Sequence, residues 1–168
     1  YNISLKEAES QIMHSTTYGS FSKLIEGNVD LIFSTPLSQE QYAMANDRNV
    51  QLELVPIAKE AFVFVVNANN PVNSLTKQQL KDIYSGKITN WKEVGGNDAP
   101  IVAYQRNSTS GSQNYMIDFM GDTKLMEPIT EFTPDSMVGL MDAIAIYDNA
   151  ENAIGYSYFY YVNTMYKK

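Results

Sequence analysis

Apolar runs of strand length alternate with capped helices along this chain, and this alternation limits its fold more than any other feature. Residues 61–66 read Ala-Phe-Val-Phe-Val-Val, β-branched and aromatic throughout as in a β-strand. Residues 29–33 form a second such run, of the kind found in buried parallel strands. Residues 38–41 and 76–79 each fit a capping box, which predicts that a helix begins there. Strands and helices in alternation predict an α/β fold.

The remaining predicted elements continue this alternation. Strands are expected over residues 11–15, 52–56, 101–104 and 153–156, and helices over residues 17–26, 113–120 and 136–147. The last of these helices would take Asp135 or Ser136 as its N-cap. The best boundary between two lobes lies near residues 57–60, between two predicted strands.

Composition excludes several kinds of chemistry. The 168 residues include no cysteine, which excludes disulfides, thiolate metal sites and a cysteine nucleophile. The single histidine, His14, has no second histidine with which to share a metal and no placed partners that would make it a general base. The net charge of −7 argues against broad nucleic-acid binding, which needs a basic surface. No apolar run is long enough to span a membrane. We therefore expect no metal and no cofactor.

The polar segment over residues 105–112, Gln-Arg-Asn-Ser-Thr-Ser-Gly-Ser, is the strongest candidate for a ligand site. It follows a predicted strand and opens a predicted helix, whose first N–H groups and partial positive charge attract anions. Gly111 lets the backbone approach a ligand closely, and Ser110 and Ser112 add hydroxyl donors. Arg106 adds a planar guanidinium suited to a tetrahedral oxyanion. These groups predict an oxyanion site; the alternative is an ordinary polar loop with a serine N-cap.

Two further hydroxyl clusters lie at predicted junctions between elements. Thr17 belongs to a Thr-Thr-Tyr-Gly run at the start of the 17–26 helix. Ser34 and Thr35 follow the predicted strand over 29–33 at its C-terminal end, where ligands bind in open α/β sheets. Each cluster taken alone is also typical of a cap or a turn. Three such clusters at junctions of the same kind favour a shared ligand site.

Enzyme motifs are scarce, which favours binding over catalysis. The chain has no GxGxxG, Walker, HExxH or GxSxG motif. Residues 20–23, Ser-Phe-Ser-Lys, match the SxxK pattern of penicillin-recognising acyltransferases, but no SDN or KTG element accompanies them. A serine acyltransferase using Ser20 and Lys23 is therefore only a minor alternative, and we expect that the chain is not an enzyme.

A specific block, Ser-Gly-Lys-Ile-Thr-Asn-Trp, occupies residues 85–91. It is preceded by Asn-Asn-Pro-Val at residues 69–72 and followed by Gly-Gly at residues 95–96. With Arg106, the Ser-Gly-Ser at 110–112 and the Ala-Ile-Gly-Tyr at 153–156, this pattern resembles the phosphate-binding proteins of phosphate ABC transporters. The resemblance extends over residues 17–160 and is closest to the Gram-positive, lipoprotein-type members of that family.

The resemblance implies a periplasmic-binding-protein type II fold, with two α/β lobes and the anion in the cleft between them. It implies part of lobe one over residues 1–58 and most of lobe two over residues 59–168, without the family's N-terminal and C-terminal segments. The family grips phosphate with an arginine followed four residues later by Ser-Gly-Thr, a pattern that Arg106 begins and residues 110–112 complete, with Ser112 in the threonine's place. The family's helix-start serine falls on Thr17, and its ligand aspartate falls on Thr35, after Ser34.

The implied function is extracytoplasmic binding of phosphate or a related oxyanion for uptake by an ABC transporter, with the permease subunits as protein partners. The protein would be periplasmic or a cell-surface lipoprotein, held to the membrane only by a lipid anchor outside this chain. The family's aspartate accepts the proton of hydrogen phosphate, whereas Thr35 carries no charge, so the resemblance leaves the oxyanion open. The alternative is an extracellular interaction or sensor module of the same fold with no role in anion transport.

Overall fold

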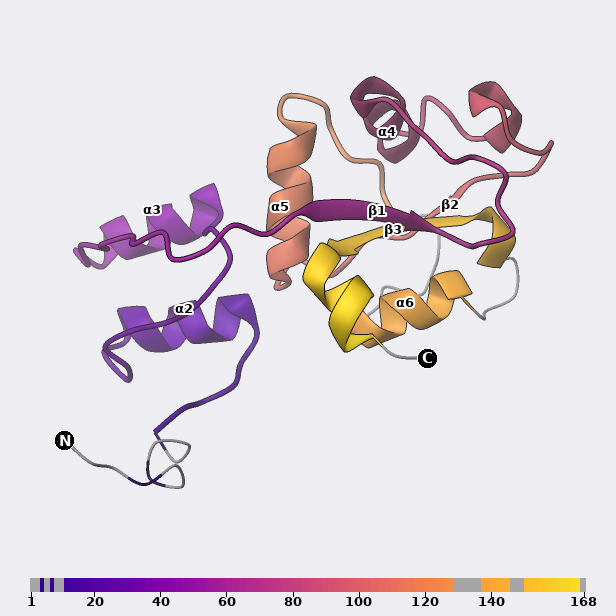
Figure 1. Ribbon diagram of the computed structural model, residues 1–168. Helices are drawn as coiled ribbons and strands as arrows, with labels where there is room; N and C mark the ends of the chain where they lie inside the picture. The colour runs from indigo at the N-terminus through magenta and orange to yellow at the C-terminus, as the bar shows by residue number, and fades with distance from the viewer. Residues whose placement is uncertain (1–3, 5–6, 8–10, 129–136, 146–149, 167–168) are drawn as a thin grey trace. The chain divides into compact units, whose positions relative to one another are not determined.

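The computed structural model describes residues 4, 7, 11–128, 137–145 and 150–166, and these group into two compact units (Figure 1). The first unit is Tyr1–Glu53 together with Thr109–Gly111. The second unit is Leu54–Ser108 together with Ser112–Lys168. None of the described helices is long and apolar enough to cross a membrane.

A three-stranded sheet organises the second unit. Its strands are β1 (Phe62–Val66), β2 (Val102–Ala103) and β3 (Ala153–Tyr158), in the order β1-β3-β2. β1 runs antiparallel to β3, with Phe62 opposite Tyr158, and β2 runs parallel to β3. The β-branched and aromatic composition of β1 predicts this strand, and the structure confirms it.

Side chains on the two faces of this sheet enter two separate apolar clusters. Along β3, Ile154 and Tyr156 pack with Tyr84 and Trp91 in the larger cluster, while Ala153 packs on the other face. The alternation follows from the two-residue period of a strand. β3 is therefore buried on both faces, which makes it the centre of this unit.

Helices cover both faces of the sheet (Figure 1). α4 (Lys77–Tyr84) and α5 (Gly111–Met120) supply apolar side chains to the larger cluster, and α6 (Met137–Ala145) supplies the smaller one. α4 begins as predicted, because Thr76 and Gln79 form a reciprocal capping box. The predicted N-cap of the last helix, Asp135 or Ser136, lies outside the described residues.

The Ser-Gly-Lys-Ile-Thr-Asn-Trp block has a structural role in this unit. Asn90 caps the short 3-10 helix Trp91–Val94, accepting a hydrogen bond from the Lys92 N–H. The Trp91 side chain is buried, and its indole N–H donates to the Asn152 carbonyl at 2.9 Å. Gly95 ends this helix with a φ of 88°, a conformation that costs a glycine little. The block therefore anchors the chain that follows α4 to the segment leading into β3.

The first unit contains two helices and a small apolar core. α2 (Thr17–Ile25) and α3 (Gln39–Asp47) pack through Phe21, Ile25 and Ala45. α3 begins as predicted, with a reciprocal capping box between Ser38 and Gln41. Both helices follow the apolar spacing and caps of the sequence.

Three of the predicted strands are wrong. Residues 11–15, 29–33 and 52–56 form no strand in the structure. Ile32 and Leu52 pack against the helices, but Leu31 and Phe33 are 70% and 76% exposed. A strand exists only when a neighbour accepts and donates its backbone hydrogen bonds, and no described segment of the first unit pairs with these runs. Strand-forming side chains are therefore not sufficient here.

Candidate functional site

The candidate site is centred on Gly111, the first residue of α5. Gly111 is buried, and two threonine hydroxyls lie against its α-carbon. A methyl group at this position would lie 2.2 Å from Thr35 Oγ1 and 2.6 Å from Thr17 Oγ1. Three residues that the sequence analysis selected from three separate segments therefore meet at the start of one helix. The first N–H groups of a helix point out of its end without helical partners, and this is where anions bind.

Thr17 does not cap α2, although a cap was the alternative role predicted for the threonine cluster that contains it. The N-cap of α2 is Thr16, whose hydroxyl accepts a hydrogen bond from the Gly19 N–H at 3.1 Å. The Thr17 side chain lies beside Gly111. The two adjacent threonines therefore have different roles: Thr16 caps α2, and Thr17 contacts the position of Gly111.

Thr35 shows the clearest sign of a ligand site. Its Oγ1 atom is buried and has no hydrogen-bond partner among the described residues. A buried hydroxyl without a partner costs about 1–3 kcal/mol, so native proteins rarely retain one without a reason. A ligand oxygen at the start of α5 would supply that partner.

Arg106 is held by a buried network in the second unit. Its backbone N–H donates to Tyr156 Oη at 2.9 Å and to Gln113 Oε1 at 3.1 Å, and the Tyr156 hydroxyl also donates to Gln113 Oε1. Gln105 accepts from Gln113 and donates to the Met126 carbonyl at 2.8 Å. Because Gln113 belongs to the first turn of α5, the network fixes the Arg106 backbone relative to that turn.

The charge of Arg106 acts on two nearby tyrosines. Burial raises the pKa of Tyr156 far above its ordinary value of 10, and the backbone N–H and charge of Arg106 offset part of that rise. Burial also raises the pKa of Tyr161, again opposed by the charge of Arg106, while the charge of Asp142 adds to the rise. The hydroxyls of Tyr156 and Tyr161 therefore stay neutral near neutral pH.

The other predicted site residues differ in their surroundings. Ser112 is only 2% exposed and Arg106 only 8% exposed, whereas Ser110 is half-buried. Ser34 is exposed, and its hydroxyl donates to the Thr35 carbonyl at 2.8 Å, a local turn contact. The structure thus brings Thr17, Thr35 and Gly111 together and leaves Ser34 in a local turn.

Sequence reasoning missed the residues that position Arg106. Gln105 stood in the segment singled out, and Tyr156 in the Ala-Ile-Gly-Tyr motif, but neither was given a role. Gln113 was treated only as the start of a helix. Each of these three residues places a polar group between buried neighbours. Burial cannot be read from a single sequence, so no sequence signal identified them.

The described residues contain no cluster of histidine and acidic side chains that could hold a metal ion. Around Gly111 the structure places instead two threonine hydroxyls at a helix N-terminus. Such a donor set binds an anion by replacing its hydration shell.

Comparison with known proteins identifies the family. A family model described as a PBP superfamily domain matches residues 6–166. The chain belongs to the PBP superfamily. A crystal structure from Clostridium perfringens, assigned as a phosphate ABC transporter substrate-binding protein with bound phosphate, matches 87% of this PBP domain with a TM-score of 0.69 and 35% identity. An ABC-type phosphate transport receptor from Vibrio cholerae matches 90% of it with a TM-score of 0.58 and 27% identity. These matches confirm the predicted α/β, periplasmic-binding-protein type II-like fold.

Sequence relatives agree with these structures. The phosphate-binding protein PstS of Staphylococcus saprophyticus is 33% identical to this PBP domain over 112 residues, which are 64% of the chain. PstS of Staphylococcus aureus is 36% identical over 103 residues. The matches span only 35% of the first of these relatives and 57% of the Clostridium perfringens structure. The resemblance to phosphate-binding proteins expected from the sequence is confirmed.

Proposed function

We propose that this chain carries the phosphate-binding residues of a solute-binding protein that serves an ABC importer. The observation that carries the proposal is the pair of threonine hydroxyls against Gly111, one of them buried without a hydrogen-bond partner. A helix N-terminus next to such a hydroxyl is suited to an oxyanion. The phosphate-binding titles of the similar proteins from Clostridium perfringens and Staphylococcus support phosphate as the ligand.

The proposed ligand groups bind without carrying out a reaction. Thr17 and Thr35 contribute hydroxyls, and residues 110–112 contribute Ser110, Gly111 and Ser112 at the start of α5, whereas Ser34, predicted as a ligand residue, stays in its local turn. Arg106 supplies the full positive charge, and its backbone is fixed by Tyr156 and Gln113. No step in this mechanism needs a nucleophile, a general base or a metal, which agrees with the absence of enzyme motifs from the sequence.

The proposal extends to the setting in which the protein works. Proteins of the kind named among the relatives deliver their ligand to the permease of an ABC transporter, which makes permease subunits the proposed partners. We place the protein outside the cytoplasm, as a periplasmic protein or a lipoprotein whose anchor lies outside this chain. Lobe one would take residues 1–58 and lobe two residues 59–168.

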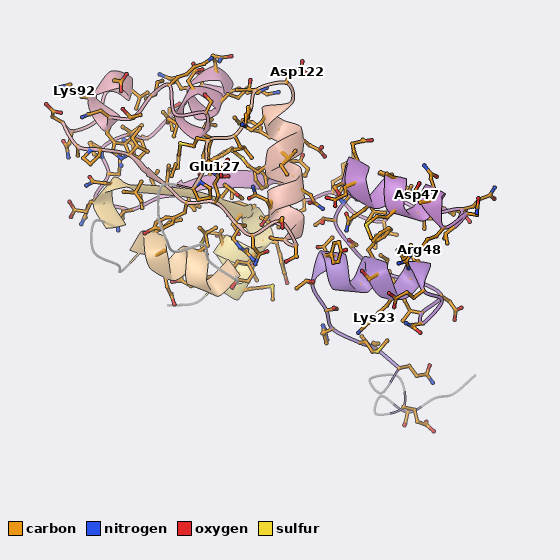
Figure 2. The ribbon with its side chains drawn as sticks, turned by 180° about the vertical axis from the view of Figure 1, so that it is seen from behind. Lys23, Asp47, Arg48, Lys92, Asp122 and Glu127 are labelled. Atoms are coloured by element: carbon orange, nitrogen blue, oxygen red, sulfur yellow. The ribbon has the colours of Figure 1, made fainter. Side chains whose placement is uncertain are left out.

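Calorimetric titration with inorganic phosphate tests the assignment. Arg106→Ala should lower phosphate affinity by at least about 30-fold, because truncating a buried, charge-assisted pair costs about 2–5 kcal/mol. Arg48→Ala is the matched control. Arg48 is the chain's only other arginine, and it follows α3 in the first unit (Figure 2). Its side chain is half exposed beside Glu26.

The control variant should bind phosphate as the unmodified protein does. Equal phosphate affinity for the unmodified protein and Arg106→Ala would refute the role given to Arg106. If the unmodified protein shows no heat of binding and no thermal shift with phosphate, sulfate, arsenate or molybdate, the transport function fails. The interaction or sensor module would then be favoured.

A further inference from the structure

Two buried side chains close the segment that begins at Arg106 into a loop. The Arg106 backbone N–H donates to Tyr156 Oη at 2.9 Å and to Gln113 Oε1 at 3.1 Å. Gln113 belongs to the first turn of α5, seven residues further along the chain. Arg106, Gln113 and Tyr156 all belong to the second unit. The closure therefore depends only on contacts within one compact unit.

The Tyr156 hydroxyl gives this closure a single arrangement. It accepts from the Arg106 N–H and donates its only proton to Gln113 Oε1. Gln113 therefore turns its oxygen toward Arg106 and its Nε2 toward Gln105, whose Oε1 accepts at 3.5 Å. Gln105 in turn donates to the Met126 carbonyl at 2.8 Å. Each donor in this chain meets an acceptor, so one orientation of the two amides satisfies the whole network.

Packing fixes the Tyr156 ring from which this hydroxyl projects. The ring is fully buried and contacts the rings of Phe62, Phe64 and Tyr84, with centroids 5.4, 6.3 and 5.7 Å away. Protein interiors are close-packed, so a ring enclosed on several sides keeps one rotamer. The hydroxyl therefore offers the Arg106 N–H an acceptor at a fixed point.

A segment that is already ordered loses less freedom when it binds a ligand than a mobile segment does. Where the binding conformation is populated only in part, the apparent affinity falls by that fraction. We infer that Tyr156 and Gln113 are positioning residues, which raise the oxyanion affinity of Arg106 by holding the 106–113 segment closed before the ligand arrives. The inference rests on the proposed function, which makes Arg106 a ligand residue.

Hydrogen exchange followed by NMR in phosphate-free protein tests the closure separately from binding. In the unmodified protein the Arg106 amide should exchange as slowly as the β1 amides that pair with β3, because all of them are hydrogen-bonded inside the second unit. Tyr156→Phe removes one acceptor of the Arg106 N–H and the donor that holds Gln113. This variant should accelerate exchange at Arg106 by at least about tenfold relative to β1.

Tyr84→Phe is the matched control for Tyr156→Phe. The Tyr84 ring is buried in the same apolar cluster, and its hydroxyl has no partner in the described structure. The control should leave the Arg106 amide protected and the phosphate affinity unchanged. In calorimetry, Tyr156→Phe should bind phosphate about tenfold more weakly than the unmodified protein. Gln113→Leu removes the other acceptor and should have the same two effects.

The outcomes separate this inference from the proposed function. An Arg106 amide that exchanges fast in the unmodified protein and slows only when phosphate is added would overturn the inference and leave the function intact. Equal acceleration of Arg106 and β1 in Tyr156→Phe would show a general loss of stability and overturn the positioning role, as would unchanged phosphate affinity in that variant. If the unmodified protein binds no phosphate, the proposed function fails and the effect on affinity falls with it. Because the first measurement uses the unmodified protein, it holds even if a variant does not fold.

Discussion

Adding a methyl group at Gly111 should abolish most of the anion affinity without unfolding the protein. The new carbon would lie 2.2 Å from Thr35 Oγ1, whereas carbon and oxygen atoms in contact normally stay about 3.3 Å apart. The hydroxyl must therefore move by about 1 Å, which takes it out of hydrogen-bond distance of a ligand placed for the native position. Thr17 Oγ1, at 2.6 Å from the same carbon, must move as well.

The size of the effect follows from the hydrogen bonds that are lost. A hydrogen bond to a charged group contributes about 1.5–3 kcal/mol, so losing the bond from Thr35 alone should weaken phosphate binding by about 10- to 150-fold. Folding should change little, since Gly111 does not have a positive φ and alanine is a better helix former than glycine by up to about 1 kcal/mol. Moving Thr35 to another rotamer should destabilise the fold by a similar free energy, which offsets this gain in helix stability.

Calorimetry with phosphate and unfolding in urea, carried out on the same Gly111→Ala sample, separate the two effects. Thr35→Val is the matched variant, because it removes the hydroxyl and leaves the space around Gly111 unchanged. Both variants should lose phosphate affinity. The unfolding midpoint should stay close to that of the unmodified protein in Gly111→Ala and should rise in Thr35→Val, because that variant removes a buried hydroxyl without a partner. Wild-type affinity in both variants would show that the start of α5 is not where the anion binds.

Two predictions concern stability. Tyr84→Phe should stabilise the fold by up to about 1–3 kcal/mol in urea unfolding, because the Tyr84 hydroxyl is buried without a partner in the described structure. Burial also raises the pKa of Tyr84 well above 10, so the unmodified protein should lose stability as the pH rises past 10, and the variant less steeply; equal slopes would contradict this. Gly155→Ala should cost about 1–3 kcal/mol, because its methyl would lie 2.5 Å from Ile144 Cδ1 and 3.1 Å from Leu140 Cδ1; an unchanged unfolding midpoint would refute this packing argument.

Local sequence predicted the helices well and the strands unevenly. The capping boxes at Ser38 and Thr76 act through residues three positions away, so their sequence signature alone was enough to locate α3 and α4. β1 also appeared where its composition predicted it. The run at 29–33 carries equally strand-like side chains and forms no strand, because strand formation depends on a partner elsewhere in the chain.

The sequence predicted the residues of the candidate site but not the residues that position Arg106. Arg106 and residues 110–112 stand close together in sequence, at a strand-to-helix junction whose chemistry is local. Tyr156 accepts a hydrogen bond from the Arg106 backbone, fifty positions away in sequence, and no pattern in either segment predicts that contact. Positioning residues of this kind emerge only when distant segments are brought together.

The sequence by itself determined the chemistry available to this protein. The sequence has hydroxyl side chains, a glycine and one arginine at the junctions between elements, and it has no cysteine and only one histidine. Tertiary structure decided which of those groups meet. It gave the capping role to Thr16, left Ser34 in an exposed turn, and brought Thr17 and Thr35 against Gly111. The physical reason is that capping and helix periodicity depend on neighbours within one turn, whereas burial of a hydroxyl depends on the whole unit packed around it.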